Sequence, residues 1–171
     1  MSDKKVNLSS KLALTWLAAA ESGFCRAEDW QRWADSKIEN FDGLPYWIYD
    51  VSLAVDISSL RMAASEATYE LDLEAPGTLE IAPMVLGFYF LRFRLKQISL
   101  FELLKLAGLV ADSGFAGIDP ESFYCILNDL ESSKISLVEG ERLAASILKP
   151  RCRIAASNWN EMMPGQMVSC D

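Results

Sequence analysis

The sequence predicts a single all-α domain of about seven or eight helices, packed as hairpins around a central pair of apolar helices. The stretch over 79–110 is the most apolar part of the 171-residue chain. Ser99 and Glu102 stand in the S-x-x-E spacing of a capping box, and so do Ser136 and Glu139, which indicates two helix starts. The hydrophobic fraction of 51% is large enough for one sizeable core.

The first half of the chain carries start and stop signals for four helices. Gly23 follows the first periodic apolar segment, and Pro45 fits a first helical position, where its missing N–H costs no hydrogen bond. Ser58 or Ser59 can cap the fourth helix. The expected ranges are 9–22, 27–40, 45–54 and 58–69.

The most apolar stretch is expected to form two consecutive helices. Residues 81–91 are apolar without a break, and Arg92, Arg94 and Lys96 follow them. This segment is too short for a membrane span, which needs about 20 apolar residues, so we expect a buried helix and no membrane segment. The second helix starts at Ser99.

A small β-hairpin within 69–96 is the alternative for part of this region. Residues 69–74 alternate apolar and acidic, and 91–96 alternate apolar and basic, which is the period of a half-buried strand. We prefer the helical interpretation because the second segment continues an apolar run and its neighbours are strongly helical.

The last third of the chain is predicted to hold two more helices and a tail. Asp119 and Pro120 mark the start of one helix, and Ser136 opens the other, which Pro150 is expected to end. Trp159 and the methionines that follow it could let the tail dock in part.

One helical domain is expected over 1–171, with mobile ends at 1–8 and 165–171. The opening segment is polar and contains an acid, so it does not indicate a secretory signal. We therefore expect a cytoplasmic location.

The four cysteines are expected to be reduced thiols. Cys25, Cys125, Cys152 and Cys170 are scattered without a C-x-x-C spacing, and the chain has no histidine to complete a zinc site. We therefore expect free thiols and no metal site.

The residues that carry most enzyme chemistry are missing. Histidine is the commonest general base and triad member, and there is none. No glycine-rich phosphate-binding motif is present either. An enzyme is therefore the least favoured class, and no cofactor is expected.

The charge pattern favours a basic protein as partner. A net charge of -8 repels a phosphate backbone, so nucleic-acid binding is not expected. Neither 62–91 nor 106–133 contains a lysine or arginine. The acids of the first block are Glu66, Glu70, Asp72, Glu74 and Glu80, and those of the second are Asp112, Asp119, Glu121, Asp129 and Glu131. They form either two solvated faces or an acidic surface for a cationic protein.

Tyr46 and Tyr49 are further candidates for the partner surface. They flank Trp47 near the start of the third expected helix. Tyrosine and tryptophan dominate binding hot spots, but they also pack in cores and at core edges, and the sequence leaves both interpretations open.

Three segments resemble the immunity proteins of bacterial contact-dependent growth inhibition and polymorphic-toxin systems. They are W-A-D-x-x-I at 33–38, L-P-x-W-I-x-D-x-S at 44–52 and I-S-L-F-E-L-L at 98–104. The resemblance implies a non-catalytic protein that binds one cognate secreted toxin domain in the cytoplasm and blocks it stoichiometrically; the toxin is often a nuclease. It assigns no functional residue. The alternative is a helical adaptor or regulatory scaffold with no toxin partner.

Overall fold

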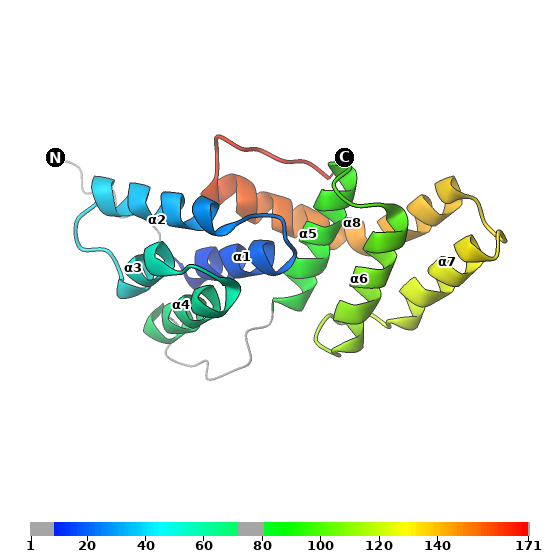
Figure 1. Cartoon of the computed structure of the whole chain (residues 1–171), viewed down its shortest axis with the longest axis horizontal. Coiled ribbons are helices and arrows are strands. Elements are labelled where there is room, and N and C mark those ends of the chain that lie inside the picture. The colour runs from blue at the N-terminus through cyan, green and yellow to red at the C-terminus, as the bar shows by residue number, and fades with distance from the viewer. Residues whose placement is uncertain (1–8, 72–80, 171) are drawn as a thin grey trace.

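The computed structural model describes residues 9–71 and 81–170, and within these ranges all regular structure is helical (Figure 1). The helices are α1 (Ser10–Glu21), α2 (Ala27–Asn40), α3 (Tyr46–Leu53), α4 (Ile57–Leu71), α5 (Ala82–Arg94), α6 (Leu100–Asp112), α7 (Glu121–Glu131) and α8 (Leu137–Met162). They form one compact domain, which confirms the predicted all-α class. No helix of the described part is long and apolar enough to cross a membrane.

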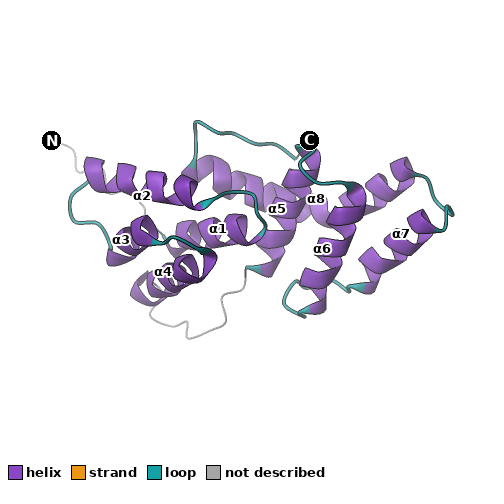
Figure 2. Ribbon diagram, viewed as in Figure 1, coloured by secondary structure: helices purple, strands orange, loops and turns teal. Residues whose placement is uncertain are grey.

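The helices form two groups joined by α5 and α8. Helices α1 to α4 gather at one end of the molecule, α6 and α7 lie at the other, and α5 stands between them (Figure 1). Figure 2 shows the same arrangement with only helices and loops in the described part. The apolar helix α5 is central, as predicted, but it packs most extensively against α8 rather than against α6.

The crossing of α5 and α8 is close because of a glycine. A Cβ atom added at Gly87 would lie 2.8 Å from the carbonyl carbon of Arg151 and 2.9 Å from the Cβ of Ala155. Such distances are shorter than ordinary van der Waals contacts, so only glycine lets the two backbones approach this far.

Helix α8 continues through Pro150, so the predicted end of the last helix at this residue is wrong. Its start is as predicted, because the Ser136 hydroxyl accepts a hydrogen bond from the Glu139 N–H at 3.2 Å. A proline removes one helical hydrogen bond, which costs about 3 kcal/mol in a free helix. Here Cys152 and Ala155 are fully buried beyond the proline, and this packing holds the second half of the helix in place.

A chain of aromatic rings fixes the first helices to α8. Trp16 of α1 lies 5.7 Å from Trp33 of α2 and 5.4 Å from Trp159 of α8, measured between ring centroids. Trp33 in turn stacks on Trp47 of α3 at 6.2 Å. Offset and edge-to-face contacts of this kind contribute about 0.5–1.5 kcal/mol each beyond the buried area.

Capping side chains set the starts of two further helices. Ser99 and Glu102 form the predicted capping box at α6, because each side chain bonds the backbone N–H of the other residue. Helix α4 starts at Ile57, slightly before the predicted serines. Asp56 and Ser59 bond each other's N–H groups there, so the aspartate is the residue that opens the helix.

The alternative β-hairpin is contradicted wherever the structure describes it. Tyr69 belongs to α4, and residues 91–94 belong to α5. The described parts of the two segments, 69–71 and 91–94, are therefore helical and not extended. The remainder of the proposed first strand, 72–74, lies outside the described residues.

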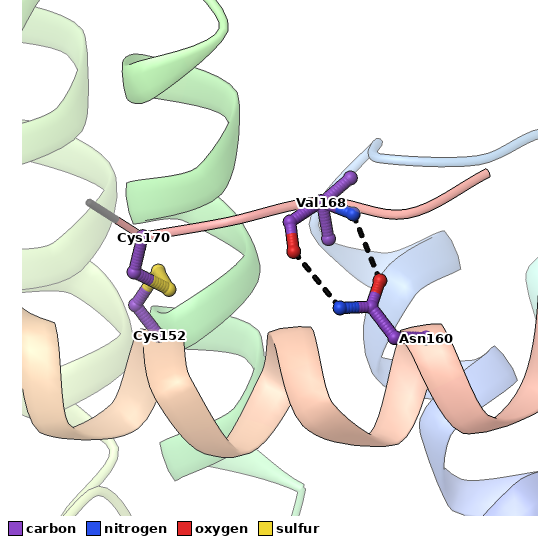
Figure 3. The surroundings of a disulfide bond; sticks show 4 residues. All are labelled: Cys152, Asn160, Val168 and Cys170. Carbon is purple, nitrogen blue, oxygen red and sulfur yellow. Dashed lines mark hydrogen bonds between the residues drawn. A yellow bond between two sulfur atoms is a disulfide. The ribbon is translucent and has the colours of Figure 1, made fainter. Parts of the chain in front are cut away.

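The C-terminal tail is bound to α8, and one of its bonds corrects an expectation about the cysteines (Figure 3). Cys152 and Cys170 form a disulfide, so the prediction of reduced thiols is wrong for this pair. The Val168 N–H donates to Asn160 Oδ1 at 2.8 Å, and Asn160 Nδ2 donates to the Val168 carbonyl at 2.9 Å. The tail is therefore bound to α8 at Val168 and Cys170. The expected mobility of 1–8 and 165–171 stays a prediction, and residues 1–8 and 171 lie outside the described residues.

Candidate partner-binding surface on the α3–α4 pair

Helices α3 and α4 form a supported platform at one end of the molecule. Ala54 follows α3, and its carbonyl accepts hydrogen bonds from Trp30 Nε1 at 2.8 Å and Gln31 Nε2 at 3.0 Å of α2. Arg61 of α4 forms an ion pair with Glu21 of α1. These bonds fix both helices to their neighbours, so their outer faces are presented in a defined geometry.

The outer face of α3 follows from its helical period. Trp47, Ile48 and Val51 point into the core and are fully buried. Helical spacing then places Tyr46 and Leu53, seven residues apart, on the opposite side. Their residues are 79% and 74% exposed, so α3 presents large apolar side chains to solvent.

Helix α4 has a matching apolar stripe. Leu60 and Ala64 are buried in the core, while Met62 and Tyr69 are each 71% exposed. Glu66 is exposed as well and lies between them at the i+4 position from Met62, so the three side chains share one face of the helix.

The α3–α4 face, as we call this surface, holds half of the large apolar side chains that the described part of the chain exposes. Its apolar members are Tyr46, Tyr49, Leu53, Val55, Ile57, Met62 and Tyr69. Leu53 of α3 and Met62 of α4 also line a common hollow. Isolated exposed apolar residues are ordinary, but exposed apolar residues gathered around a hollow are typical of interaction sites.

A hollow of about 410 Å³ lies between the two helices within this face. Its lining residues are Asp50, Leu53, Ala54, Ser59, Met62, Ala63 and Glu66. Four of these residues are apolar, and each helix contributes one carboxylate to the lining.

The face carries negative charge without local neutralisation. The side-chain carboxylates of Asp50 and Glu66 form no ion pair or hydrogen bond within the described residues. Arg61 is the one cation of the two helices, and Glu21 neutralises it. The backbone N–H of Ser59 and then its hydroxyl hold the pKa of Asp56 below its usual value, which keeps this carboxylate ionised at neutral pH.

Three of the predicted site residues belong to these two helices and are exposed. Tyr46, Tyr49 and Glu66 lie on the α3–α4 face, although Tyr49 is only 39% exposed. Glu70 belongs to α4, but its side chain is not described. The three other acids of the first block, Asp72, Glu74 and Glu80, lie outside the described residues.

Six residues of the surface were not predicted as site residues from the sequence, namely Asp50, Leu53, Val55, Ile57, Met62 and Tyr69. An apolar residue in a helical pattern is ordinarily assigned to the core, so Leu53 and Met62 gave no signal of exposure. Their spacing from Tyr46 and Tyr69 did contain a clue, because each pair is seven residues apart on the side of its helix away from the buried residues.

The second acidic block divides between the two ends of α7. Asp112, Asp119 and Glu121 lie around the α6–α7 connection, while Asp129 and Glu131 end the helix. Asp129 lies eight residues after Glu121, a rise of about 12 Å along the helix, and the charges of Asp119, Glu121 and Asp129 all act on Cys125 between them. The block lies at the end of the molecule away from the α3–α4 face (Figure 1).

Two acids of this block serve local structure. Asp119 Oδ1 accepts a hydrogen bond from the Glu121 N–H at 3.1 Å, and Asp129 pairs with Lys134 at 3.3 Å. Although 106–133 contains no lysine or arginine, Asp129 is thus paired with a lysine that follows this block. The hydrogen bond of Asp119 and the ion pair of Asp129 are contacts within this chain, so neither contact requires a partner protein.

The two remaining cysteines are free thiols, as predicted. Burial first, and then the nearby charge of Asp29, raise the pKa of the Cys25 thiol. Partial desolvation, followed by the carboxylates of Glu121, Asp129 and Asp119 and the hydrogen bond to Glu121, raises the pKa of Cys125. Neither thiol is therefore ionised at neutral pH. Within the described residues, no group of acids and cysteines is arranged to hold a metal ion.

Comparison with protein-family models, with curated proteins and with solved structures finds no match to this chain.

Proposed function

We propose that this protein is an immunity protein: it binds a cognate secreted toxin domain, a cationic nuclease, in the cytoplasm of the producing cell and neutralises it by stoichiometric occlusion. The α3–α4 face is the observation that carries the proposal. It combines exposed apolar anchors with unneutralised carboxylates on a supported platform, and a basic protein surface has the complementary chemistry.

The mechanism of inhibition is steric and electrostatic. A nuclease binds its substrate through cationic groups that contact phosphates. Carboxylates such as Asp50 and Glu66 can occupy these positions, while Tyr46 and Leu53 anchor the complex through buried area. Nucleic acid is then excluded from the groove without any chemical step.

The side-chain chemistry supports binding rather than catalysis. The chain contains no histidine, and the raised pKa values of Cys25 and Cys125 leave these thiols protonated and weakly nucleophilic. The α3–α4 face supplies carboxylates and aromatic rings, which suit recognition of a cationic protein.

Co-expression with the toxin tests this proposal. The C-terminal domain of the secreted-toxin gene next to this gene is expressed alone and together with the protein, and growth and nucleic-acid degradation are measured. We expect protection, together with a 1:1 complex in size-exclusion chromatography.

A variant with Tyr46→Ala and Leu53→Ser should lose protection, because two exposed anchors are removed. The exposed pair Leu109→Ser and Val138→Ser on α6 and α8 is the matched control and should protect normally.

Two results contradict the proposal. One is the absence of a toxin gene beside this gene, which favours the helical adaptor instead. The other is unrestrained toxicity despite folded protein in excess over the toxin.

A further inference from the structure

We propose that the α3–α4 face receives an amphipathic helix of the partner, whose apolar stripe enters the hollow and whose lysine or arginine residues flank that stripe. This inference rests on the proposed function, since it specifies which element of the toxin domain would be bound. It is carried by the place of the hollow between two helices, by the exposed apolar residues that line it and by its two carboxylates.

The arrangement of the two helices favours a helix as the bound element. The described residues contain no strand edge to which an extended segment could add. A third helix can lie along the furrow between two packed helices, with axes about 8–10 Å apart, because its ridges fill the groove between them. Leu53 of α3 and Met62 of α4 line the hollow from its two sides, and both are exposed, so they would contact both sides of such a helix.

The charges select a basic helix. Asp50 lies on the α3 side of the hollow and Glu66 on the α4 side, and neither has a partner within the described residues. A helix with an apolar stripe and cations on both flanks would pair with the two carboxylates at once. Opposite charges at the edge of an apolar contact set register and exclude other partners.

The same charges disfavour two other occupants. Residues 72–80 of this chain follow α4, but they contain three acids and no lysine or arginine. A second copy of the protein bound through the same face would bring carboxylates against carboxylates, since a two-fold interface places each patch on itself. A cationic element of another protein avoids both conflicts.

A polar hollow on α2 provides the internal comparison. It has a volume of about 430 Å³ and is lined by Glu28, Gln31, Arg32, Asp35, Ser36 and Glu39. It is therefore also acidic and of similar size, but it has no large apolar lining. A ligand held by charge alone would bind both hollows, whereas an amphipathic helix would prefer the α3–α4 face.

The test uses a synthetic leucine–lysine peptide that forms an amphipathic helix of about 15 residues, roughly 22 Å long. Its binding to the full chain is measured by calorimetry, and amide chemical shifts locate the site. A peptide with serine in place of leucine is the charge-only control. We expect the leucine–lysine peptide to bind at least tenfold more tightly and to perturb α3 and α4.

Matched variants of the protein complete the experiment. One variant removes the apolar anchors by Leu53→Ser and Met62→Ser, and another reverses the charges by Asp50→Lys and Glu66→Lys. Each should raise the dissociation constant of the peptide about tenfold or more, as loss of interface anchors does. Glu28→Lys with Asp35→Lys on α2 changes the net charge equally and should leave it within about twofold, because these residues lie outside the apolar face. Circular dichroism verifies folding of each variant.

Two outcomes overturn the inference. In one, both peptides bind equally well; in the other, the α2 variant weakens binding as much as the α3–α4 variants do. If the toxin is neutralised while the peptide shows either behaviour, the helix inference falls and the proposed function stands. If the peptide behaves as expected but no toxin is neutralised, the proposed function falls and the face remains a site for basic helices.

Discussion

At the scale of single residues, Gly87 is the glycine of the described part at which an added side chain would meet the backbone of another helix. A methyl group there would meet the backbone of Arg151, which cannot move without displacing α8. We expect Gly87→Ala to lower the free energy of unfolding by about 2 kcal/mol, because the overpacking exceeds the gain of about 1 kcal/mol in helix propensity. Urea denaturation monitored by circular dichroism measures the difference.

Gly165 is the matched control for this substitution. It lies in the C-terminal tail, and nothing stands within 4 Å of an added Cβ. Gly165→Ala should change the free energy of unfolding by less than about 0.5 kcal/mol, the usual range for surface positions. Equal effects of the two substitutions would show that the α5–α8 crossing is not tight.

The residue scale also shows what the sequence could predict about the surface. Aromatic density and the order of charges along the chain predict Tyr46, Tyr49 and Glu66 as residues of the partner surface, because both patterns can be read from the sequence. Leu53 and Met62 were not, because the sequence does not reveal which side of a helix remains uncovered after packing. That depends on α3 and α4 having no further helix over their outer faces in the described part of the chain.

At the scale of elements, local signals located most helices. The range predicted for the second helix agrees with α2, and the capping box at Ser99 opens α6. Caps and turn residues act within four positions, so sequence patterns contain them. The fate of Pro150 and the pairing of Cys152 with Cys170 depend instead on contacts of α8 with α5 and with the tail, which no local pattern specifies.

The C-terminal tail is the element whose attachment can be tested most directly. The disulfide closes a loop with a sequence separation of 18 residues, and Asn160 adds two hydrogen bonds to Val168. On the chain-entropy account, a cross-link of this size contributes about 3 kcal/mol. We expect dithiothreitol to lower the free energy of unfolding by roughly this amount and to increase proteolysis of the tail.

Variants separate the disulfide from other effects of the reductant. Cys152→Ala with Cys170→Ala should reproduce the reduced stability and make it insensitive to dithiothreitol. Cys125→Ala removes an exposed free thiol and should behave as the unchanged protein does. If unchanged protein unfolds at the same urea concentration with and without reductant, the disulfide does not contribute to stability in solution.

At the scale of the whole molecule, the acidic residues divide into groups with different expected roles. The net charge of -8 creates a field that attracts a basic partner from any side. The α3–α4 face adds apolar anchors to its charge, whereas Asp112 and Glu131 lie at the opposite end of the molecule and at either end of the α6–α7 pair. Steering and anchoring can therefore be separated by position.

Charge reversals at the two ends make this separation measurable with the cognate toxin domain. The first variant carries Asp50→Lys and Glu66→Lys, and the second carries Asp112→Lys and Glu131→Lys. Both variants change the net charge equally. Both should therefore slow association at low salt, since steering depends on the summed field. Only the first pair should also raise the dissociation rate, by about tenfold or more, because only those carboxylates would contact the partner. Stopped-flow association and surface-plasmon-resonance dissociation at two salt concentrations give the two rates. A faster dissociation from the Asp112 and Glu131 variant alone would place the interface on α6 and α7 instead.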